Sequence, residues 1–439
     1  MNRTVSEILE FVQENDIKFI RLQFCNVFGE LKNISIMASQ LEKAFTHGIS
    51  FDGFAVGGFT NIEESDLFLV PDPTTLSILP WRPQEGAVAR FFCFIKTPDG
   101  EIFEGDTRNS LKKTVEKLYN HDYRAKIGPE CEFYLFKTDE EAEPILIPQD
   151  NAGYFDVAPF DKGENIRRDI CLTLEEMGLT PESSHHETGP GQNEIDFKFD
   201  NPLESADNLI TLKTVVKTIA SVNGLHATFM PKPLINKSGS GLHINMSLTK
   251  GEKNIFVTEA THSEEAESFI AGILGRIKEI TAVLNPTVNS YKRFGGFEAP
   301  EYITWAHKNR TQLIRIPASK GEYSRMELRS PDSTCNPYLA FKLLIDAGLE
   351  GIINKSKLKR FESEDVYTNE KNKEFDRLPK NLGEALKLMK ESEFVKESLG
   401  DYVYNKFLDA KTKEWEVYKE KWEEDETSDW EINNYFYKF

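Results

Sequence analysis

The segment KIGPECEFYLF, residues 126–136, has the composition of a buried strand and yet carries two acids. Side chains two positions apart in a strand lie on one face, so Glu130 and Glu132 point the same way. Two carboxylates this close repel each other and resist burial unless a positive group holds them. The segment therefore predicts a sheet whose acidic face holds a cation.

Three other segments place charged or imidazole side chains where a buried strand should be apolar. Glu187 and Glu194 flank the Gly-Pro-Gly bend of HHETGPGQNEIDF, His243 lies in GSGLHINMSL, and Glu327 lies in SRMELRS. One such segment is most simply a half-exposed strand with a polar outer face, but four in one region favour a common explanation. Hard divalent cations such as Mg²⁺ and Mn²⁺ prefer carboxylate oxygens, and five carboxylates exceed what one Mg²⁺ takes from a protein. Two metal ions are therefore predicted.

Residues 292–329 reverse the acidic balance of the chain. They hold eight Lys or Arg side chains against four Glu and no Asp. By composition alone, a solvated basic surface explains this excess as well as a binding site does. The arginines alternate with apolar residues in TQLIRIP and SRMELR, and strand-borne arginines suit bidentate capture of phosphate or carboxylate. Beside two metal ions they predict a site for a small polyanion such as ATP. The chain has no Walker A sequence and no G-x-G-x-x-G, so metals and arginines would hold the nucleotide.

The bulk composition limits the classes of function. A net charge of −19 argues against broad contact with nucleic acid or an anionic membrane. The longest apolar runs are too short to cross a bilayer, and the N-terminus has no signal-peptide pattern. Five scattered cysteines include no CxxC pair. We therefore expect a cytoplasmic protein with reduced thiols and with neither a nucleic acid nor a membrane as partner.

The periodicity of the sequence predicts an α+β fold with two domains, residues 1–102 and 103–439. The first combines one helix with alternating strands and a loop rich in Gly and acids, and Thr4 and Glu7 are spaced like a capping box. The second alternates strands with helices and ends in an aromatic tail that should dock on the rest. Helices are predicted at about 4–15, 107–120, 164–178, 203–222, 337–353, 382–398 and 402–422.

These segments resemble type I glutamine synthetase, and the matching motifs follow the family order over nearly the whole chain. The motifs are FDGFAVGGF, ESDLFLVPDP, FEGDTR, GPECEF, SHHETGPGQNEIDF, HATFMPKP, GSGLHINMSL, NPTVNSYKRFGGFEAP, NRTQLIRIP and RMELRSPDSTCNPYLA. The length resembles that of the short alpha subtype of bacteria and archaea. The resemblance implies an N-terminal β-grasp domain and a catalytic domain with a curved antiparallel sheet and helices. It also implies a homododecamer of two rings with active sites between adjacent subunits.

The resemblance implies an enzyme that forms L-glutamine from L-glutamate and ammonium, with ATP as co-substrate and γ-glutamyl phosphate as intermediate. It implies two Mg²⁺ or Mn²⁺ ions in each site. One would be held by Glu132, Glu187 and Glu194, and the other by Glu130, His243 and Glu327.

The same resemblance carries further roles onto individual residues. Asp52 of the neighbouring subunit would help to take a proton from ammonium, and Glu298 would lie on a flap that closes over the intermediate. The remaining positions are Arg310 as catalytic, Gly239, Arg293, Arg329, Tyr154 and Asp66 as substrate-binding, and Glu182, Ser247, Arg315 and Arg325 as ATP-binding.

The chain departs from the family pattern at several points. Phe54 and Ala55 replace two serines, and the flap KRFGGFEAP is about one residue shorter than the common form. Its two glycines predict a more flexible flap with altered closure. Asn61 stands where feedback-sensitive relatives carry an arginine, which predicts weak or differently built inhibition by glutamine. Adenylylation is not expected, although Tyr367 lies in the corresponding region.

Two other functions stay open. A γ-glutamyl ligase of the same fold would use a polyamine in place of ammonia, and the change at Phe54 and Ala55 keeps this alternative. Asp52, Glu298 and Tyr154 favour ammonium. A non-catalytic homologue would bind a partner such as a transcription regulator, but it would be free to lose the metal positions, and all of them are intact.

Overall fold

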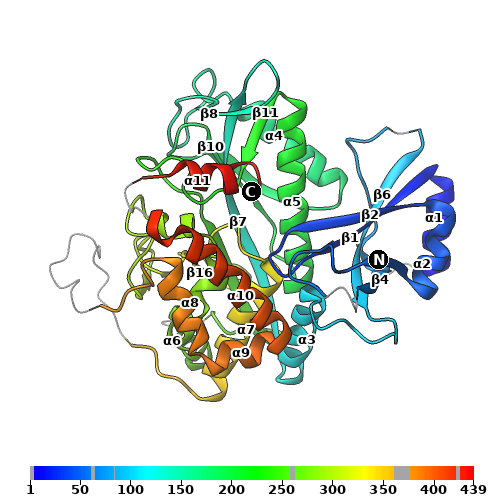
Figure 1. Cartoon of the computed structure of the whole chain (residues 1–439). Coiled ribbons are helices and arrows are strands. Elements are labelled where there is room, and N and C mark those ends of the chain that lie inside the picture. The colour runs from blue at the N-terminus through cyan, green and yellow to red at the C-terminus, as the bar shows by residue number, and fades with distance from the viewer. Residues whose placement is uncertain (1–3, 61–64, 84, 258–262, 360–374, 422–425) are drawn as a thin grey trace.

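The structure, a computed structural model, describes residues 4–60, 65–83, 85–257, 263–359, 375–421 and 426–439 (Figure 1). The predictions on Asn61 and Tyr367 lie outside the described residues. Within those residues, no helix combines the length and the apolar character that crossing a bilayer requires.

The N-terminal part builds a mixed sheet of six strands in the order β2-β1-β6-β4-β3, with β5 paired to β6. β1 runs parallel to β6, and its other neighbour, β2, is antiparallel. The elements are α1 (Val5–Glu14), β1 (Ile17–Cys25), β2 (Leu31–Met37), α2 (Leu41–His47), β3 (Ile49–Asp52), β4 (Asp66–Pro71), β5 (Ser77–Ile78) and β6 (Ala87–Lys96). Thr4 and Glu7 cap α1 reciprocally, as their spacing predicts.

The rest of the chain builds a sheet of ten strands in the order β14-β15-β16-β12-β7-β10-β9, so the predicted α+β architecture is confirmed. β8 and β11 also pair with β7, and β13 pairs with β12. The strands are β7 (Tyr123–Thr138), β8 (Pro144–Pro148), β9 (Pro181–His186), β10 (Gln192–Phe197), β11 (Leu225–Thr228), β12 (Leu242–Lys250), β13 (Lys253–Asn254), β14 (Trp305–His307), β15 (Ile314–Ile316) and β16 (Met326–Leu328). The position of the domain boundary at residue 102 stays a prediction.

Helices cover the ten-stranded sheet. α5 lies beside β7, and α6 to α10 lie together at the bottom of the view in Figure 1. The helices are α3 (Thr107–Asn120), α4 (Glu164–Glu176), α5 (Pro202–Val222), α6 (Glu264–Leu284), α7 (Pro337–Ile353), α8 (Leu382–Lys390), α9 (Glu393–Leu399), α10 (Asp401–Tyr418) and α11 (Asp429–Glu431). The predicted helix 382–398 is two helices, because Ser392 accepts a hydrogen bond from the Val395 amide and caps a new start. The predicted helix 402–422 ends earlier, at Tyr418, and α6 was not predicted.

The aromatic tail docks as expected. Tyr435 and Phe436 are buried, and the Phe436 ring centroid lies 4.9 Å from that of Phe136 in β7. The backbone amide of Phe229 donates to the carbonyl oxygen of Phe439 at 2.9 Å. The end of the chain is therefore part of the packed core.

The contact between α6 and α7 depends on glycine. A Cβ on Gly272 would press against the carbonyl oxygen of Ala347 and lie 2.8 Å from the Cα of Gly351. We expect Gly272→Ala to destabilise the protein by about 1–3 kcal/mol, because neither backbone has room to move. Gly275, on the exposed side of the same helix, has nothing within 4 Å of its Cβ position. Gly275→Ala should instead stabilise by about 1 kcal/mol, and urea unfolding of both variants measures the two changes.

Candidate active site

Neighbouring strands bring acidic side chains to one face of the larger sheet. Directly paired residues of antiparallel strands lie side by side on the same face. Glu132 of β7 pairs with Glu194 of β10, which pairs in turn with His185 of β9. Glu130 pairs with Asp196 on one side and with His243 of β12 on the other. The strand pairing therefore forces several carboxylates into one region.

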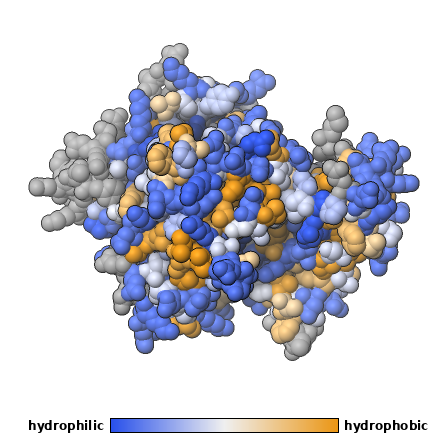
Figure 2. Space-filling model, turned by 90° about the horizontal axis from the view of Figure 1, so that it is seen from above, coloured by the Kyte–Doolittle hydropathy of each residue, from blue (hydrophilic) through white to orange (hydrophobic). Residues whose placement is uncertain are grey.

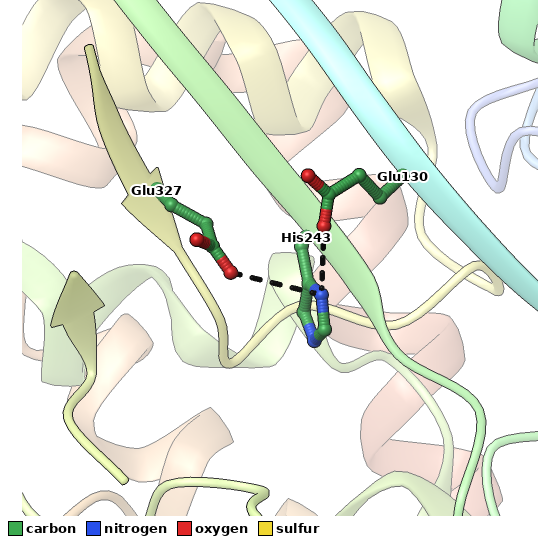
Figure 3. Close-up of side chains that lie close together, drawn as sticks. All are labelled: Glu130, His243 and Glu327. Atoms are coloured by element: carbon green, nitrogen blue, oxygen red, sulfur yellow. Dashed lines mark hydrogen bonds and ion pairs between the residues drawn. The ribbon is translucent and has the colours of Figure 1, made fainter. Parts of the chain in front are cut away.

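The first cluster contains Glu130, His243 and Glu327 (Figure 3). His243 Nδ1 lies 3.2 Å from Glu130 Oε2 and 3.8 Å from Glu327 Oε1. Asn245 Nδ2 donates to Glu130 Oε1 at 2.8 Å and fixes the other oxygen of that carboxylate. The structure thus brings together one of the two predicted ligand sets.

The second cluster centres on Glu194, which the structure groups with Glu132 and His243, and also with His185 and Glu187. His185 Nε2 lies 3.1 Å from Glu194 Oε1, and His185 Nδ1 lies 3.4 Å from Glu187 Oε1. The three carboxylates of the other predicted set therefore gather around Glu194. His185, which lies between Glu187 and Glu194, was not among the residues predicted from the sequence.

Asp196 was also missed, although the signal was available for both residues. His185 is two positions from Glu187, and Asp196 is two positions from Glu194, so a strand places each on the acidic face. The sequence alone did not show that β9 forms the edge of this sheet, which is what brings His185 against Glu194.

The electrostatics divide the cluster into two halves. Burial raises the pKa of Glu187 to about 8 and that of Asp196 to about 7, and repulsion from neighbouring carboxylates adds to both. Burial and the charge of Asp196 raise the pKa of Glu194 well above its usual range. Glu130 is different: burial opposes its charge, but the hydrogen bond from His243 lowers its pKa to about 2. Crowded carboxylates with an imidazole among them form a donor set that fits divalent metal ions.

Arginines border the first cluster. The buried Glu327 accepts a hydrogen bond from Arg315 Nη1 at 2.6 Å and another from Arg329 Nη1. Arg329 Nη2 lies 3.9 Å from Glu298 Oε2, and Glu298 is exposed. Arg293 donates to the backbone carbonyl oxygens of Arg329 and Ser330, at 2.9 and 2.8 Å.

Gly239 is closely packed at the same place. A Cβ on Gly239 would lie 2.9 Å from Arg293 Cγ, so this position has no room for a side chain. Its carbonyl oxygen accepts a hydrogen bond from Gln192 Nε2, which also donates to Glu132. Gly239 therefore belongs to the packing around the second cluster.

A pocket opens beside Glu130, and the predicted ATP-binding residues Glu182, Ser247 and Arg325 line it. Arg325 Nε donates to Asn245 Oδ1 at 2.7 Å. The rings of Phe199 and Tyr323 also line the pocket, with centroids 6.4 Å apart, and the sequence analysis did not identify them. The fourth predicted residue, Arg315, is not among the lining residues and instead pairs with Glu327.

Four other predicted residues lie in different surroundings. Tyr154 is half exposed, and its ring centroid lies 5.7 Å from that of His185. Arg310 is exposed, and its positive charge lowers the pKa of Glu187 in opposition to burial. Asp52 and Asp66 lie on the other sheet, where they pair with each other across β3 and β4. Among the described residues, no hydrogen bond or ion pair joins Asp52 or Asp66 to the acidic clusters.

Two family models match the chain. One, described as the β-grasp domain of glutamine synthetase, covers residues 16–98, and the other, described as the catalytic domain of glutamine synthetase, covers residues 104–435. Proteins named glutamine synthetase are similar over their full length. Those of Clostridium saccharobutylicum and Staphylococcus aureus are 50% and 45% identical over 99% of both chains, and that of Methanosarcina mazei is 48% identical over 98% of this chain and 97% of its own.

Solved structures are also similar. Two of them are structures of a protein named GmaS, one in complex with ADP and the other without ligand. Both have a TM-score of 0.87 and 30% sequence identity, and they cover 99% and 98% of this chain and 99% of their own.

The raised pKa of Glu187 predicts that metal binding releases protons. At pH 7 this carboxyl is mostly protonated in the metal-free protein, and a metal ion binds the deprotonated form. The affinity for Mg²⁺ should therefore rise by about tenfold per pH unit for each proton released, up to pH 8. Because the folded pKa lies above the unfolded one, the stability that the protonated group contributes is lost as the pH rises towards 8.

Titration calorimetry with Mg²⁺ in two buffers of different protonation enthalpy measures this release. Glu187→Gln should release about one proton fewer at pH 7, whereas Glu116→Gln, on the exposed side of α3, should match the unchanged protein. Equal proton release by the Glu187→Gln variant and the unchanged protein would contradict the assignment.

Proposed function

The chain belongs to the glutamine synthetase family and is an ATP-dependent glutamate–ammonia ligase, and we propose that it works through γ-glutamyl phosphate at a site shared between two subunits. The observation that carries the proposal is the acidic face of the larger sheet, with arginines on one side and the pocket beside Glu130 on the other. Such a face suits the transfer of a phosphoryl group from ATP to a carboxylate.

Divalent metal use follows from the family, and we propose two ions in each site, Mg²⁺ or Mn²⁺. Glu130, His243 and Glu327 would hold one, and Glu132, Glu187 and Glu194 would hold the other. When bound, the ions neutralise the negative charge that develops on the transferring phosphoryl group. His185 would keep Glu187 and Glu194 in place, since it lies within reach of both.

The chain's own residues then divide the remaining work. The pocket beside Glu130 would hold ATP, with Glu182, Ser247 and Arg325 in its wall and aromatic rings that suit the face of a base. Arg315 and Arg329 would stabilise the phosphoryl oxygens, because both reach Glu327 from the basic stretch.

The glutamate side of the site would use a separate set of groups. Arg310, Arg293 and the closely packed Gly239 would lie around the substrate, and Tyr154 would lie beside them against His185.

Ammonium must lose a proton before it attacks, and the acyl phosphate must be protected from water. Glu298, next to Arg329, would lie over the intermediate on the closing flap. Asp52 would take the proton, with Asp66 nearby, from a second copy of the chain, since both lie on the other sheet.

A shared site requires subunits that bind each other, and we propose a dodecamer. Apolar side chains are exposed both on the N-terminal part and on the rest of the chain (Figure 2). Phe54 follows Asp52, and the loop around Tyr154 exposes Phe155, Val157 and Phe160. Contiguous apolar patches mark interaction surfaces on soluble proteins, and we propose that these side chains lie in contacts between subunits.

A γ-glutamyl-amine ligase is the second candidate. The change at Phe54 and Ala55 keeps it open, whereas the retained Asp52, Glu298 and Tyr154 favour ammonium. Location in the cytoplasm and binding of a transcription regulator stay predictions from the sequence.

Phosphate release from ATP, with Mg²⁺ and glutamate, separates the two activities. We expect release with ammonium and with hydroxylamine, and little with putrescine, because the retained Asp52 and Tyr154 suit a small cation. A Glu327→Gln variant should release none with any amine, which controls for contaminating ATPases. Release with putrescine but not with ammonium would contradict the assignment.

Hybrid oligomers test the shared site. Asp52→Ala and Glu327→Ala should each abolish glutamine formation, since they remove groups from the two halves of one site. Assembly of equal amounts of both variants should restore about a quarter of the sites, because that fraction receives both intact halves. If the site were complete within one chain, co-assembled variants would stay inactive.

A further inference from the structure

A fully buried ion pair joins the C-terminal tail, residues 426–439, to Lys292, the first residue of the flap, residues 292–300. Lys292 Nζ lies 2.7 Å from Glu431 Oε2, and both side chains are 0% exposed. Lys292 belongs to a 3₁₀ helix, Val288–Arg293, which ends at the second residue of the flap. Burial of two charges is costly unless their other hydrogen-bonding groups are also satisfied.

Both carboxylate oxygens of Glu431 accept hydrogen bonds from neighbouring groups. Tyr418 OH donates to Glu431 Oε2 at 2.6 Å, Asn289 Nδ2 donates to Oε1 at 2.8 Å, and the Ser428 amide donates to Oε2 at 2.8 Å. These donors come from α10, from the 3₁₀ helix and from the tail itself. Glu431 is therefore the point at which three segments are held together.

Asn289 extends this connection to Lys232. Its Oδ1 accepts a hydrogen bond from the Lys232 amide at 2.7 Å, and its Nδ2 also donates to the Lys232 carbonyl oxygen at 3.1 Å. Thr427 of the tail donates to the same carbonyl oxygen at 3.1 Å. The position of the Lys232 backbone thus depends on the tail from two directions.

Lys232 reaches the flap. Its side chain is buried, and Nζ lies 4.7 Å from the ring centroid of Phe297, a cation–π distance. Phe297 and Glu298 both have positive φ, 51° and 64°, a backbone region that costs free energy for residues other than glycine. Two strained residues in succession need support from outside the flap, and Lys232 supplies a contact to the first of them.

We propose that Glu431 is a positioning residue for the flap. Through Lys292 and Asn289 the tail holds the base of the flap and the Lys232 side chain beneath it, so that Glu298 closes over the reacting groups. This inference rests on the proposed function, because it assumes an acyl phosphate that the flap protects from water. Loss of the tail contact should let water reach the intermediate before ammonia does.

The test compares two rates in the full-length enzyme. One is glutamine formation with ammonium, and the other is glutamate-dependent hydrolysis of ATP to ADP and phosphate without ammonium. Glu431→Gln leaves Lys292 buried without its counter-charge. We expect glutamine formation to fall by about tenfold, and the ratio of hydrolysis to glutamine formation to rise by about tenfold, because small misplacements of closing groups have effects of this size.

Two further variants make the result decisive. Tyr418→Phe removes one hydrogen bond to Glu431 and should change the ratio in the same direction by about threefold. Lys438→Met removes the ion pair between the other end of the tail and Glu30, 2.5 Å in length, and should leave the ratio unchanged.

A tail that only stabilises the fold would lower the melting temperature and leave the ratio unaltered. An unchanged ratio in folded Glu431→Gln enzyme overturns the proposal, and Tyr418→Phe decides in the same way if Glu431→Gln does not fold. Failure of the unchanged enzyme to form glutamine from ammonium would instead overturn the proposed function.

Discussion

Repulsion between carboxylates on adjacent strands is the constraint on which this structure depends. β-sheet hydrogen bonding places Glu130 and Glu132 beside Asp196 and Glu194, and the opposite face of β7 is fully buried at Cys131. A slip of one residue in the register would carry the acids into the core, so the strands cannot relieve the repulsion by shifting. Protonation or bound cations must relieve it, and the raised pKa of Glu187 is the protonation that a metal ion would replace.

The neighbouring elements divide this acidic face into two parts. On the side of β12 and β16, His243 and the arginines that reach Glu327 favour ionised carboxylates, and the pKa of Glu130 falls to about 2. On the side of β9 and β10 the acids have mainly each other as neighbours, and the pKa of Glu187 rises to about 8. On the proposed assignment, the first half would bind phosphate and metal together, and the second would exchange protons for a metal ion.

Chemistry on this face requires groups that a flat sheet cannot supply. Ammonium must be deprotonated, and water must be kept from the acyl phosphate. Asp52 lies on the other sheet, which supports a site shared between subunits. The flap contains strained residues at Phe297 and Glu298, which supports a need for outside contacts. In the proposed site the acidic face belongs to one chain, and the groups that complete it would come from a second subunit and from other segments.

Side chains that share a strand face can be recognised from the sequence alone. The alternation of side chains predicted that Glu130 and Glu132 share a face and that the residues around His243 and Glu327 occupy polar positions in strands. The spacing of Thr4 and Glu7 predicted the helix cap. These features depend on neighbours within a few residues. Which of these faces meet depends on the packing of the whole chain. It brought His185 of the edge strand β9 against Glu194 of β10, and it buried Glu431 against Lys292. These contacts depend on which strands and segments pack together, and local periodicity contains no information about that choice.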